Sequence, residues 1–259
     1  MYNNCNYPIK NPSKTIAVII PAYNEAKTIS QVLDLLITKV HDLSEIIIVD
    51  DGSIDQTGEI CRRYTEHNSM VKYHPQPRNM GKTEALKKGF KLSTGEIVII
   101  QDADLEYNPA DINIVVEPIQ KAIADVVFGS RFLVRKTAYK PYLRHYLANR
   151  LITFLSNLFT NLDLTDVETC YKAFRGDIIR DMIITSNRFG FEVEAVAKIA
   201  KLKCRVTEVP ISYYGRTYKE GKKISFLDGC MAIFYIIKFN VFTSKNSSFT
   251  QQNKSGILC

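Results

Sequence analysis

The chain has 259 residues, which is enough for one large domain or two small ones. Apolar residues make up 46% and charged residues 24% of it, and only 12 glycines and 9 prolines occur, which excludes a collagen-like or low-complexity chain. Residues 1–130 hold 13 Lys and Arg against 17 Asp and Glu, whereas residues 131–225 hold 18 against 9. This asymmetry favours a cation site in the first half and an anionic partner for the second.

The first half alternates apolar runs with helical patterns. Continuous apolar runs, typical of strands buried on both faces, predict strands at residues 15–20 and 45–49. Further strands are predicted at residues 71–74, 97–100 and 126–128. Helical periodicity predicts the helices between them, at residues 29–37, 55–65, 80–92 and 109–122. This alternation favours an α/β fold, a mostly parallel sheet with helices on both faces, which binds ligands at the carboxyl ends of its strands. The loops at those ends are residues 21–25, 50–55, 102–106 and 129–132.

Two amphipathic helices are predicted in the second half, at residues 142–162 and 226–242. Each is either an ordinary packed helix or a helix at a membrane surface, where basic residues meet anionic headgroups. Neither can cross a bilayer, because the longest apolar run covers only residues 229–237 and a span needs about 20. We therefore divide the chain into an N-terminal extension (1–14), a main domain (15–224), an interfacial helix (225–243) and a disordered polar tail (244–259).

Several other classes of protein do not match the sequence. The six cysteines lie far apart without a C-x-x-C pair, which argues against a disulfide framework or a zinc site. Residues 1–13 lack the apolar core of a signal peptide. The segment 81–83 resembles the end of a P-loop, but the first glycine of that motif would fall at Gln76, and no G-x-G-x-x-G occurs. No nucleic-acid-binding module is recognisable, so we expect no nucleic-acid partner.

Carboxylates follow two of the predicted strands. Asp102 and Asp104 come directly after the strand at 97–100, and together they can reach one hard cation, Mg²⁺ or Mn²⁺, which also binds substrate phosphates. Asp51 follows the strand at 45–49, and its carboxylate can accept hydrogen bonds from a base or a ribose. These positions predict a nucleotide site that contains a metal ion.

Two further loops complete this predicted site. Tyr23 in the first loop offers a ring on which a base can stack. Residues 79–82 open a helix, and the amides of its N-terminus together with Lys82 would suit a pyrophosphate. The four loops therefore predict a nucleoside diphosphate bridged by a metal.

Five segments, in order, resemble the glycosyltransferases of family 2 with the GT-A fold: IIPAYNE (19–25), IIVDDGSID (47–55), NMGKTEALKKGF (79–90), DADLEYNP (102–109) and FGSRF (128–132). Within that family, FGSRF, ETCYKAFR (168–175) and VPISYYGRTYKEGKKI (209–224) resemble the dolichyl- or polyprenyl-phosphate sugar synthases. The resemblance covers roughly residues 15–240. It implies a Rossmann-like GT-A fold, with residues 15–224 as the catalytic domain.

The resemblance implies three sets of functional residues. The donor set, which would contact the nucleotide sugar, is Pro21, Tyr23, Glu25, Asp51, Lys82 and Asp102. The metal set is Asp102, Asp104 and Glu106, the last standing where close relatives often have Gln. The acceptor set, in which a planar guanidinium can bind phosphate oxygens in pairs, is Arg131, Arg144 and Arg216. Of these residues, the catalytic ones are Asp102, Asp104 and Arg131.

The implied reaction is inverting transfer of a hexose from a nucleotide sugar of the UDP-glucose or GDP-mannose type to a polyprenyl or dolichyl phosphate, with Mg²⁺ or Mn²⁺ as cofactor. We expect a cytoplasmic enzyme, peripherally associated with the inner face of the membrane, and leave open a membrane-protein partner. The chain contains no Trp, so it lacks the Gln-x-x-Arg-Trp motif of the processive polysaccharide synthases of the family. This absence favours a single transfer.

Two alternatives stay open beside this reading. The first is a family 2 glycosyltransferase that acts on a sugar hydroxyl in surface glycan synthesis, which would need a carboxylate base. Glu192 and Glu194 are the carboxylates that offer this role, although both also suit structural contacts. The second is a non-catalytic relative that binds a nucleotide sugar, which the presence of both Asp102 and Asp104 disfavours.

Overall fold

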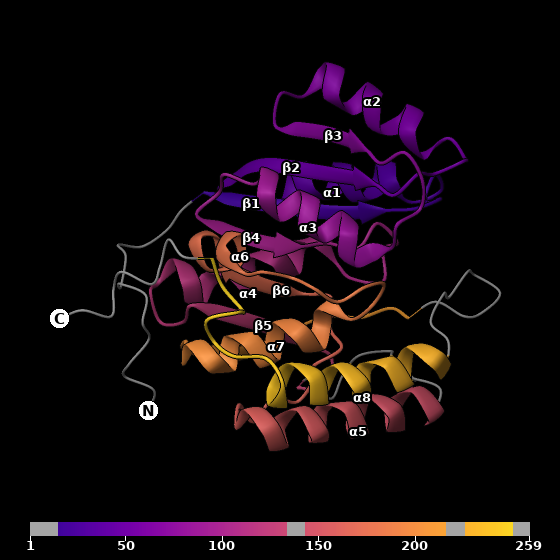
Figure 1. The fold of residues 1–259 in the computed structure, drawn as a ribbon. Coiled ribbons are helices and arrows are strands. Elements are labelled where there is room, and N and C mark those ends of the chain that lie inside the picture. The colour runs from indigo at the N-terminus through magenta and orange to yellow at the C-terminus, as the bar shows by residue number, and fades with distance from the viewer. Residues whose placement is uncertain (1–14, 134–142, 216–225, 251–259) are drawn as a thin grey trace.

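The first half of the chain folds as the predicted alternation of strands and helices (Figure 1). A computed structural model describes residues 15–133, 143–215 and 226–250 of the chain. The strands of this half are β1 (Ile16–Ala22), β2 (Leu43–Asp50), β3 (Val71–Pro75), β4 (Ile97–Ile100) and β5 (Val126–Ser130). Its helices are α1 (Ile29–Lys39), α2 (Thr57–His67), α3 (Lys82–Leu92), the short 3-10 helix η1 (Pro109–Asp111) and α4 (Ile112–Gln120). Each strand and helix predicted here is present, with its ends shifted by a few residues.

The second half contains elements that the sequence pattern did not predict: β6 (Lys172–Arg175), α6 (Gly176–Asp181), α7 (Phe191–Leu202) and β7 (Val206–Pro210). Three of them have six residues or fewer, which is too short for periodicity to identify. The longer helix α7 is buried almost all round and places charged residues among its apolar ones, so it lacks the single polar stripe of an amphipathic helix.

All the strands join in one seven-stranded sheet, in the order β3-β2-β1-β4-β6-β5-β7. β6 is antiparallel to β4 and β5, and the other pairs are parallel. The predicted mostly parallel, Rossmann-like sheet is therefore confirmed. β2 and β3 are added on one side of β1, and β4 is added on the other. The order in which strands are added across the sheet therefore changes direction between β1 and β4. Ligands bind at the carboxyl ends of strands beside such a point.

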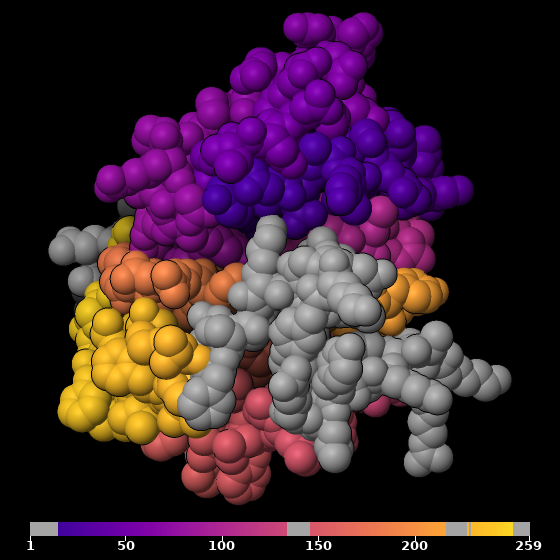
Figure 2. Space-filling view, turned by 90° about the vertical axis from the view of Figure 1, so that its right-hand side faces the viewer, coloured from indigo at the N-terminus to yellow at the C-terminus, as the bar shows by residue number. Residues whose placement is uncertain are grey.

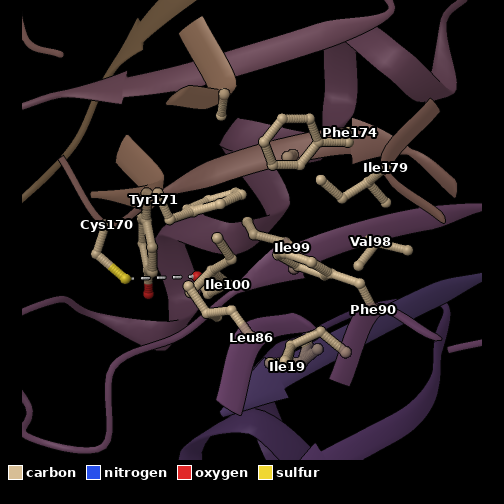
Figure 3. Packing of buried hydrophobic residues seen from close by; sticks show 14 of the residues in the cluster. Ile19, Leu86, Phe90, Val98, Ile99, Ile100, Cys170, Tyr171, Phe174 and Ile179 are labelled. Atoms are coloured by element: carbon tan, nitrogen blue, oxygen red, sulfur yellow. Dashed lines mark hydrogen bonds between the residues drawn. The ribbon is translucent and has the colours of Figure 1, made fainter. Parts of the chain in front are cut away.

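The core explains why the central strands are apolar on both faces. Residues Ile46–Val49 of β2 and Ile97–Val98 of β4 have no exposed surface. Leu86 and Phe90 of α3 pack over Ile19 of β1 and over β4 (Figure 3). Gly89 permits this close approach, because a Cβ there would lie 2.3 Å from Ile19 Cγ2. The sheet edge that carries the predicted site is thus built on a closely packed base.

The two predicted amphipathic helices are present as α5 (Leu143–Thr160) and α8 (Phe226–Val241). They lie side by side beyond the β5–β7 end of the sheet and pack on α7 (Figure 1). Figure 2 shows α5 and α8 at the bottom of the molecule, with the indigo and violet N-terminal part at the top. Over residues 15–133, 143–215 and 226–250, no helix combines the length and apolar composition needed to cross a membrane.

The predicted disorder from residue 244 onward is wrong for residues 244–250. The backbone of this segment pairs with the end of α6, since Ile183 N donates to Ser248 O at 2.9 Å and Thr250 N donates to Asp181 O at 3.0 Å. Phe249 is buried and anchors the segment in the core. One aromatic residue within a polar stretch was too weak a signal to predict this. The remainder of the tail and the extension 1–14 lie outside the described residues.

Candidate active site

The loops that follow β1, β2 and β4 are bonded to one another, which fixes the sheet edge where the donor set was predicted. Asn24 donates its backbone N–H to Ser53 Oγ at 2.9 Å. Thr28 donates its hydroxyl to the carbonyl oxygen of Ala103 at 2.7 Å. The residues of the donor set in the first loop are half-buried or buried in this framework: Pro21, Tyr23 and Glu25.

The carboxylate of Asp51 orders the loop before α3. Its Oδ1 accepts from Met80 N at 2.7 Å and from Gln76 Nε2 at 2.9 Å, and its Oδ2 accepts from Gly81 N at 2.8 Å. Burial raises the pKa of Asp51, and the two backbone N–H groups partly offset that effect. Asp51 therefore lies at the predicted edge and holds residues 76–81 in place there. Its predicted contact with a nucleoside stays a prediction.

Three N–H groups at the N-terminus of α3 have partners within the protein. Met80 N and Gly81 N donate to Asp51, and Thr83 N donates to the carbonyl oxygen of Arg188 at 3.0 Å. Gly81 makes the turn into the helix with φ of 97°, a conformation that glycine adopts without strain. The predicted contact of this helix N-terminus with a pyrophosphate stays a prediction. Lys82 is the residue of the segment whose side chain reaches the site.

Lys82 joins the loop after β4 to α7. Its Nζ lies 2.9 Å from Asp102 Oδ1 and 3.5 Å from Glu192 Oε1. Burial would lower the pKa of Lys82, but Asp102 and Glu192 hold it well above its usual value. Burial would likewise raise the pKa of Asp102, but Lys82 brings it below its usual value. At neutral pH Asp102 is therefore an ionised carboxylate beside a cation.

The three predicted metal ligands do not form one cluster. Glu106 N donates to Asp104 Oδ1 at 3.1 Å, and Glu106 Oε2 accepts from the hydroxyl of Tyr213 at 2.5 Å. In the part of the chain that the structure describes, no three His, Cys, Asp or Glu side chains converge as a metal site. Mg²⁺ commonly takes one or two carboxylates and completes its coordination with substrate phosphates and water. Asp102 and Asp104 fit that pattern, whereas Glu106 is bonded to Tyr213.

Arg131 is buried at the end of β5 and forms a two-bond ion pair with Asp166. Its Nε donates to Asp166 Oδ2 at 2.7 Å and its Nη2 donates to Asp166 Oδ1 at 2.8 Å. The guanidinium also lies over the ring of Tyr213, 5.0 Å from its centre. Burial would raise the pKa of Asp166, but Arg131 keeps it below its usual value. The side chain of Arg144 and all of Arg216 lie outside the described residues.

Two charged residues of the site were not assigned from the sequence: Glu168 and Lys172. Glu168 Oε1 and Glu192 Oε2 are both buried and accept no hydrogen bond from any described residue. Burial, followed by the charge of Glu192, raises the pKa of Glu168 to about 7. Burial lowers the pKa of Lys172, against the opposing effect of these two carboxylates. The sequence signal that could have identified them is the segment 168–175, in which charged residues lie within a short apolar strand and just before it. Buried polar atoms without partners are uncommon and mark a place for a ligand or water.

Glu194 has a structural role. Its Oε1 accepts from Thr185 N at 2.8 Å and pairs with Lys198 Nζ at 2.5 Å, while its Oε2 accepts from Ser186 N at 2.8 Å. These bonds connect α7 to the segment before it. Of the two carboxylates considered from the sequence, only Glu192 borders the site.

An open hollow of about 820 Å³ lies on the outer side of the loop after β2, between α2 and the end of β3. Arg62 and Tyr73 line it, and none of the charged residues around Lys82 and Arg131 does. The charged cluster around Lys82 and Arg131, rather than this hollow, is therefore our candidate active site.

Comparison with known proteins shows the family to which the chain belongs. Residues 17–183 match the model of glycosyl transferase family 2. Glycosyltransferase AglD of Haloferax volcanii is 26% identical over 206 residues, which are 76% of this chain and 33% of that protein. An undecaprenyl-phosphate 4-deoxy-4-formamido-L-arabinose transferase of Edwardsiella ictaluri is 31% identical over 211 residues, or 80% of this chain and 62% of that protein. The chain thus spans about a third and about three fifths of these two relatives.

A third relative is similar over nearly its whole length. It is an uncharacterized protein of Methanocaldococcus jannaschii, 28% identical over 232 residues, which are 88% of this chain and 93% of that protein. Among solved structures, glucosyl-3-phosphoglycerate synthase of Mycobacterium tuberculosis with phosphoglyceric acid superposes with a TM-score of 0.67 at 19% identity, over 88% of this chain and 80% of that one. The same enzyme was also solved with Mn²⁺, uridine diphosphate and phosphoglyceric acid. These structures share the GT-A fold. Because the family model covers more than half of it, the chain belongs to glycosyl transferase family 2.

Proposed function

We propose that the chain transfers a hexose from a nucleotide sugar to a polyprenyl phosphate, with inversion at the anomeric carbon and with Mg²⁺ or Mn²⁺. The observation that carries this proposal is the position of Tyr213. Its hydroxyl bonds to Glu106 in the loop of the predicted metal ligands, and its ring lies under the guanidinium of Arg131. The proposed cation site and the proposed anion site are therefore one aromatic side chain apart. Two substrates that both carry phosphate and react with each other need two neighbouring positive groups, one for each phosphate.

The first half supplies the donor site in this proposal. Pro21, Tyr23, Glu25 and Asp51 border the nucleoside, and Lys82 meets the diphosphate. Uridine diphosphate in a structure of the Mycobacterium tuberculosis enzyme supports a nucleoside diphosphate at this edge of the fold. The acidic first half suits a substrate that arrives with a divalent cation.

Asp102 and Asp104 would hold the metal ion at the end of β4. A bound divalent cation would supply Lewis-acid stabilisation of the diphosphate that leaves. Lys82 adds a fixed positive charge beside Asp102, which lies 2.9 Å from its ammonium group. Mn²⁺ and Mg²⁺ in structures of the Mycobacterium tuberculosis enzyme support this choice of metal.

Arg131 would receive the acceptor phosphate. A phosphate monoester is already anionic near neutral pH, so its oxygen can attack without a strong base. The role of the protein is then to orient that oxygen toward the anomeric carbon and to balance its charge. Arg144 and Arg216 belong to the same proposed acceptor set. The name of the Edwardsiella ictaluri relative, which contains undecaprenyl phosphate, supports a lipid phosphate acceptor.

A polyprenyl phosphate lies in a bilayer, and α5 and α8 offer a surface for contact with it. Their exposed side chains are mostly apolar: Leu147, Leu151, Phe154, Leu158, Leu227, Met231, Phe234, Ile237 and Val241. This set is the apolar surface. Large exposed apolar patches mark protein or membrane interaction sites. We propose peripheral binding to the inner face of a membrane, because the acceptor and the basic charge of residues 131–225 both favour an anionic bilayer.

The test uses the purified chain with labelled UDP-glucose or GDP-mannose, Mn²⁺ and a short-chain polyprenyl phosphate. We expect a labelled lipid product with wild type and a large loss of transfer with Arg131→Ala. Calorimetry with the nucleotide sugar alone should give a dissociation constant nearly unchanged by Arg131→Ala. A large loss of nucleotide-sugar affinity would instead assign Arg131 to the diphosphate.

One observation favours the alternative acceptor, a sugar hydroxyl. The unpaired oxygens of Glu168 and Glu192 are carboxylates that such an acceptor would require as a base. The same assay with soluble sugars in place of the lipid decides between the two. Transfer to a sugar hydroxyl that is lost in Glu192→Gln, without transfer to polyprenyl phosphate, would replace the first proposal by the second.

A further inference from the structure

Asp166, the partner of Arg131, is itself held by the helix that carries the apolar surface. Asn149 of α5 donates from Nδ2 to Asp166 Oδ1 at 2.9 Å. Thr153, one turn further along α5, donates to Asn149 Oδ1 at 3.0 Å, and its hydroxyl accepts from Val167 N at 3.3 Å. Asn149 and Thr153 are buried, and Asp166 has no exposed surface. Each polar atom in this chain of bonds therefore depends on its neighbour for a partner.

The same helix presents its other face to the outside. Leu147 is 56% exposed, Leu151 50% and Phe154 62%, and these residues alternate along α5 with the buried Asn149 and Thr153. Residues three and four apart share a face of a helix, so one face of α5 belongs to the apolar surface and the other contacts Asp166. α5 is thus a rigid element between the proposed bilayer contact and the arginine of the acceptor set.

The geometry of the ion pair leaves Arg131 few orientations. Asp166 takes two of its guanidinium nitrogens, and Asp166 Oδ2 also accepts from the backbone N–H of Arg131 at 3.1 Å. The hydrogen bond from Asn149 orients the carboxylate of Asp166. Because the ion pair is bidentate, the guanidinium of Arg131 is oriented by that carboxylate in turn. Glu208 fixes the backbone of the same segment, since its carboxylate accepts from Thr165 N and Asp166 N.

We propose that Asn149 and Asp166 are positioning residues, through which α5 holds the guanidinium of Arg131 in the orientation that receives the phosphate of the acceptor. The proposal rests on the proposed function, because it takes the acceptor to be a phosphate bound at Arg131. It adds that acceptor binding depends on a helix whose other face contacts the bilayer. The positioning residues touch neither substrate.

The chain offers a closely matched control. Asn157 lies two turns beyond Asn149 on α5 and bonds to the same segment, donating to Leu164 O at 2.7 Å and accepting from Leu164 N at 3.0 Å. Asn149→Ala and Asn157→Ala therefore each remove hydrogen bonds between α5 and residues 164–166, and only the first removes a bond to Asp166. For Asn149→Ala we expect the KM for polyprenyl phosphate to rise about tenfold, the factor of one hydrogen bond to a charged group. The KM for the nucleotide sugar should not change, and Asn157→Ala should alter neither KM.

A second measurement separates positioning from a general loss of structure. In an Arg131→Lys background the lysine cannot form the two-bond pair, so Asn149→Ala should have little further effect on the acceptor KM. Residues that act through one another show this lack of additivity. If the two substitutions instead multiply their effects, Asn149 acts on the acceptor independently of Arg131 and the inference is wrong.

A third measurement needs no acceptor. The Nε–H group of Arg131 gives an NMR signal that Arg131→Lys identifies by its loss. We expect faster exchange of this proton with water in Asn149→Ala and no change in Asn157→Ala. If wild type transfers no sugar to polyprenyl phosphate, the proposed function fails, and with it the role of Arg131 toward a phosphate. The exchange rate then decides only whether α5 holds the guanidinium of Arg131 through Asn149 and Asp166. Equal exchange rates in wild type and Asn149→Ala would overturn it.

Discussion

Two buried carboxylates of the site, one in each half of the molecule, are stabilised in different ways. In the first half, the carboxylate of Asp51 accepts from three neutral groups, the backbone N–H groups of residues 80 and 81 and the side-chain amide of Gln76. In the second half, the carboxylate of Asp166 forms a two-bond ion pair with Arg131.

This difference follows from the architecture. The loops of the first half leave parallel strands, and their turns direct several N–H groups at one point. Asp166 accepts from one backbone N–H group, that of Arg131, and its other partners are the guanidinium of Arg131 and the side-chain amide of Asn149. Substitution of a carboxylate that accepts only from amides leaves no unpaired charge. Substitution of a carboxylate that pairs with an arginine leaves the guanidinium without its counter-charge.

The largest expected effect comes from breaking a charge pair in the second half. Asp166→Ala leaves Arg131 buried without its counter-charge, and we expect the free energy of unfolding to fall by about 3–5 kcal/mol. Asp51→Ala leaves only neutral amides without a partner, and we expect a fall of about 1–3 kcal/mol. Urea unfolding of both variants measures the difference. The double variant Arg131→Met/Asp166→Leu should recover most of the loss, and a double variant as unstable as Asp166→Ala would contradict this account.

The two halves also differ in how much of their structure could be predicted from the sequence. Apolar runs such as 45–49 predicted the strands of the first half, and the carboxylates at their ends followed from the topology of parallel sheets. β6 and β7 are short, and α7 buries charged residues that a periodicity argument assigns to the surface. Motif resemblance placed Arg131 at the site but could not show Asp166 as its partner, because the two residues are 35 positions apart.

The second effect concerns the metal loop of the first half. Asp104→Ala removes a carboxylate at the proposed metal site, and loss of one well-placed electrostatic group typically costs about 10²–10³ in rate. The fold should be retained, which circular dichroism would check, because Asp104 lies in a half-buried turn rather than in the core. Transfer should also stop in excess EDTA. Full activity of the variant or of the EDTA-treated enzyme would remove the metal from the proposed function.

The third effect concerns the carboxyl group of Glu168, whose Oε1 is buried without a hydrogen-bond partner among the described residues. The pKa of Glu168 is raised to about 7, so the folded chain retains this proton over a pH range in which the unfolded chain has lost it. Stability therefore falls as pH rises from about 4.5 to 7, and ionised Glu168 lowers it by about 2–3 kcal/mol at the upper end. Glu168→Gln should remove this dependence. Unfolding free energies of both proteins at several pH values measure it, and parallel curves would contradict the raised pKa.

The smallest effect compares the apolar surface with an apolar residue of the first half that is even more exposed. Phe154 of α5 is 62% exposed and Ile54, in the loop after β2, is 89% exposed. If α5 and α8 contact the bilayer, Phe154→Ser removes a side chain that becomes buried on binding, whereas Ile54→Ser removes one that stays in water. Burial of such a side chain contributes about 1.5–3 kcal/mol when complete, so we expect Phe154→Ser to weaken vesicle binding by about tenfold.

Co-sedimentation with anionic vesicles at low and high salt makes this measurement. Binding should be reversible and should weaken with salt, because basic residues near the surface contribute about 1 kcal/mol each within a Debye length. Ile54→Ser should bind as wild type does at both salt concentrations. Equal losses in the two variants would mean that exposure alone, and not position, determines binding. No binding of wild type even at low salt would make α5 and α8 ordinary packing helices, and a soluble acceptor would then be the better proposal.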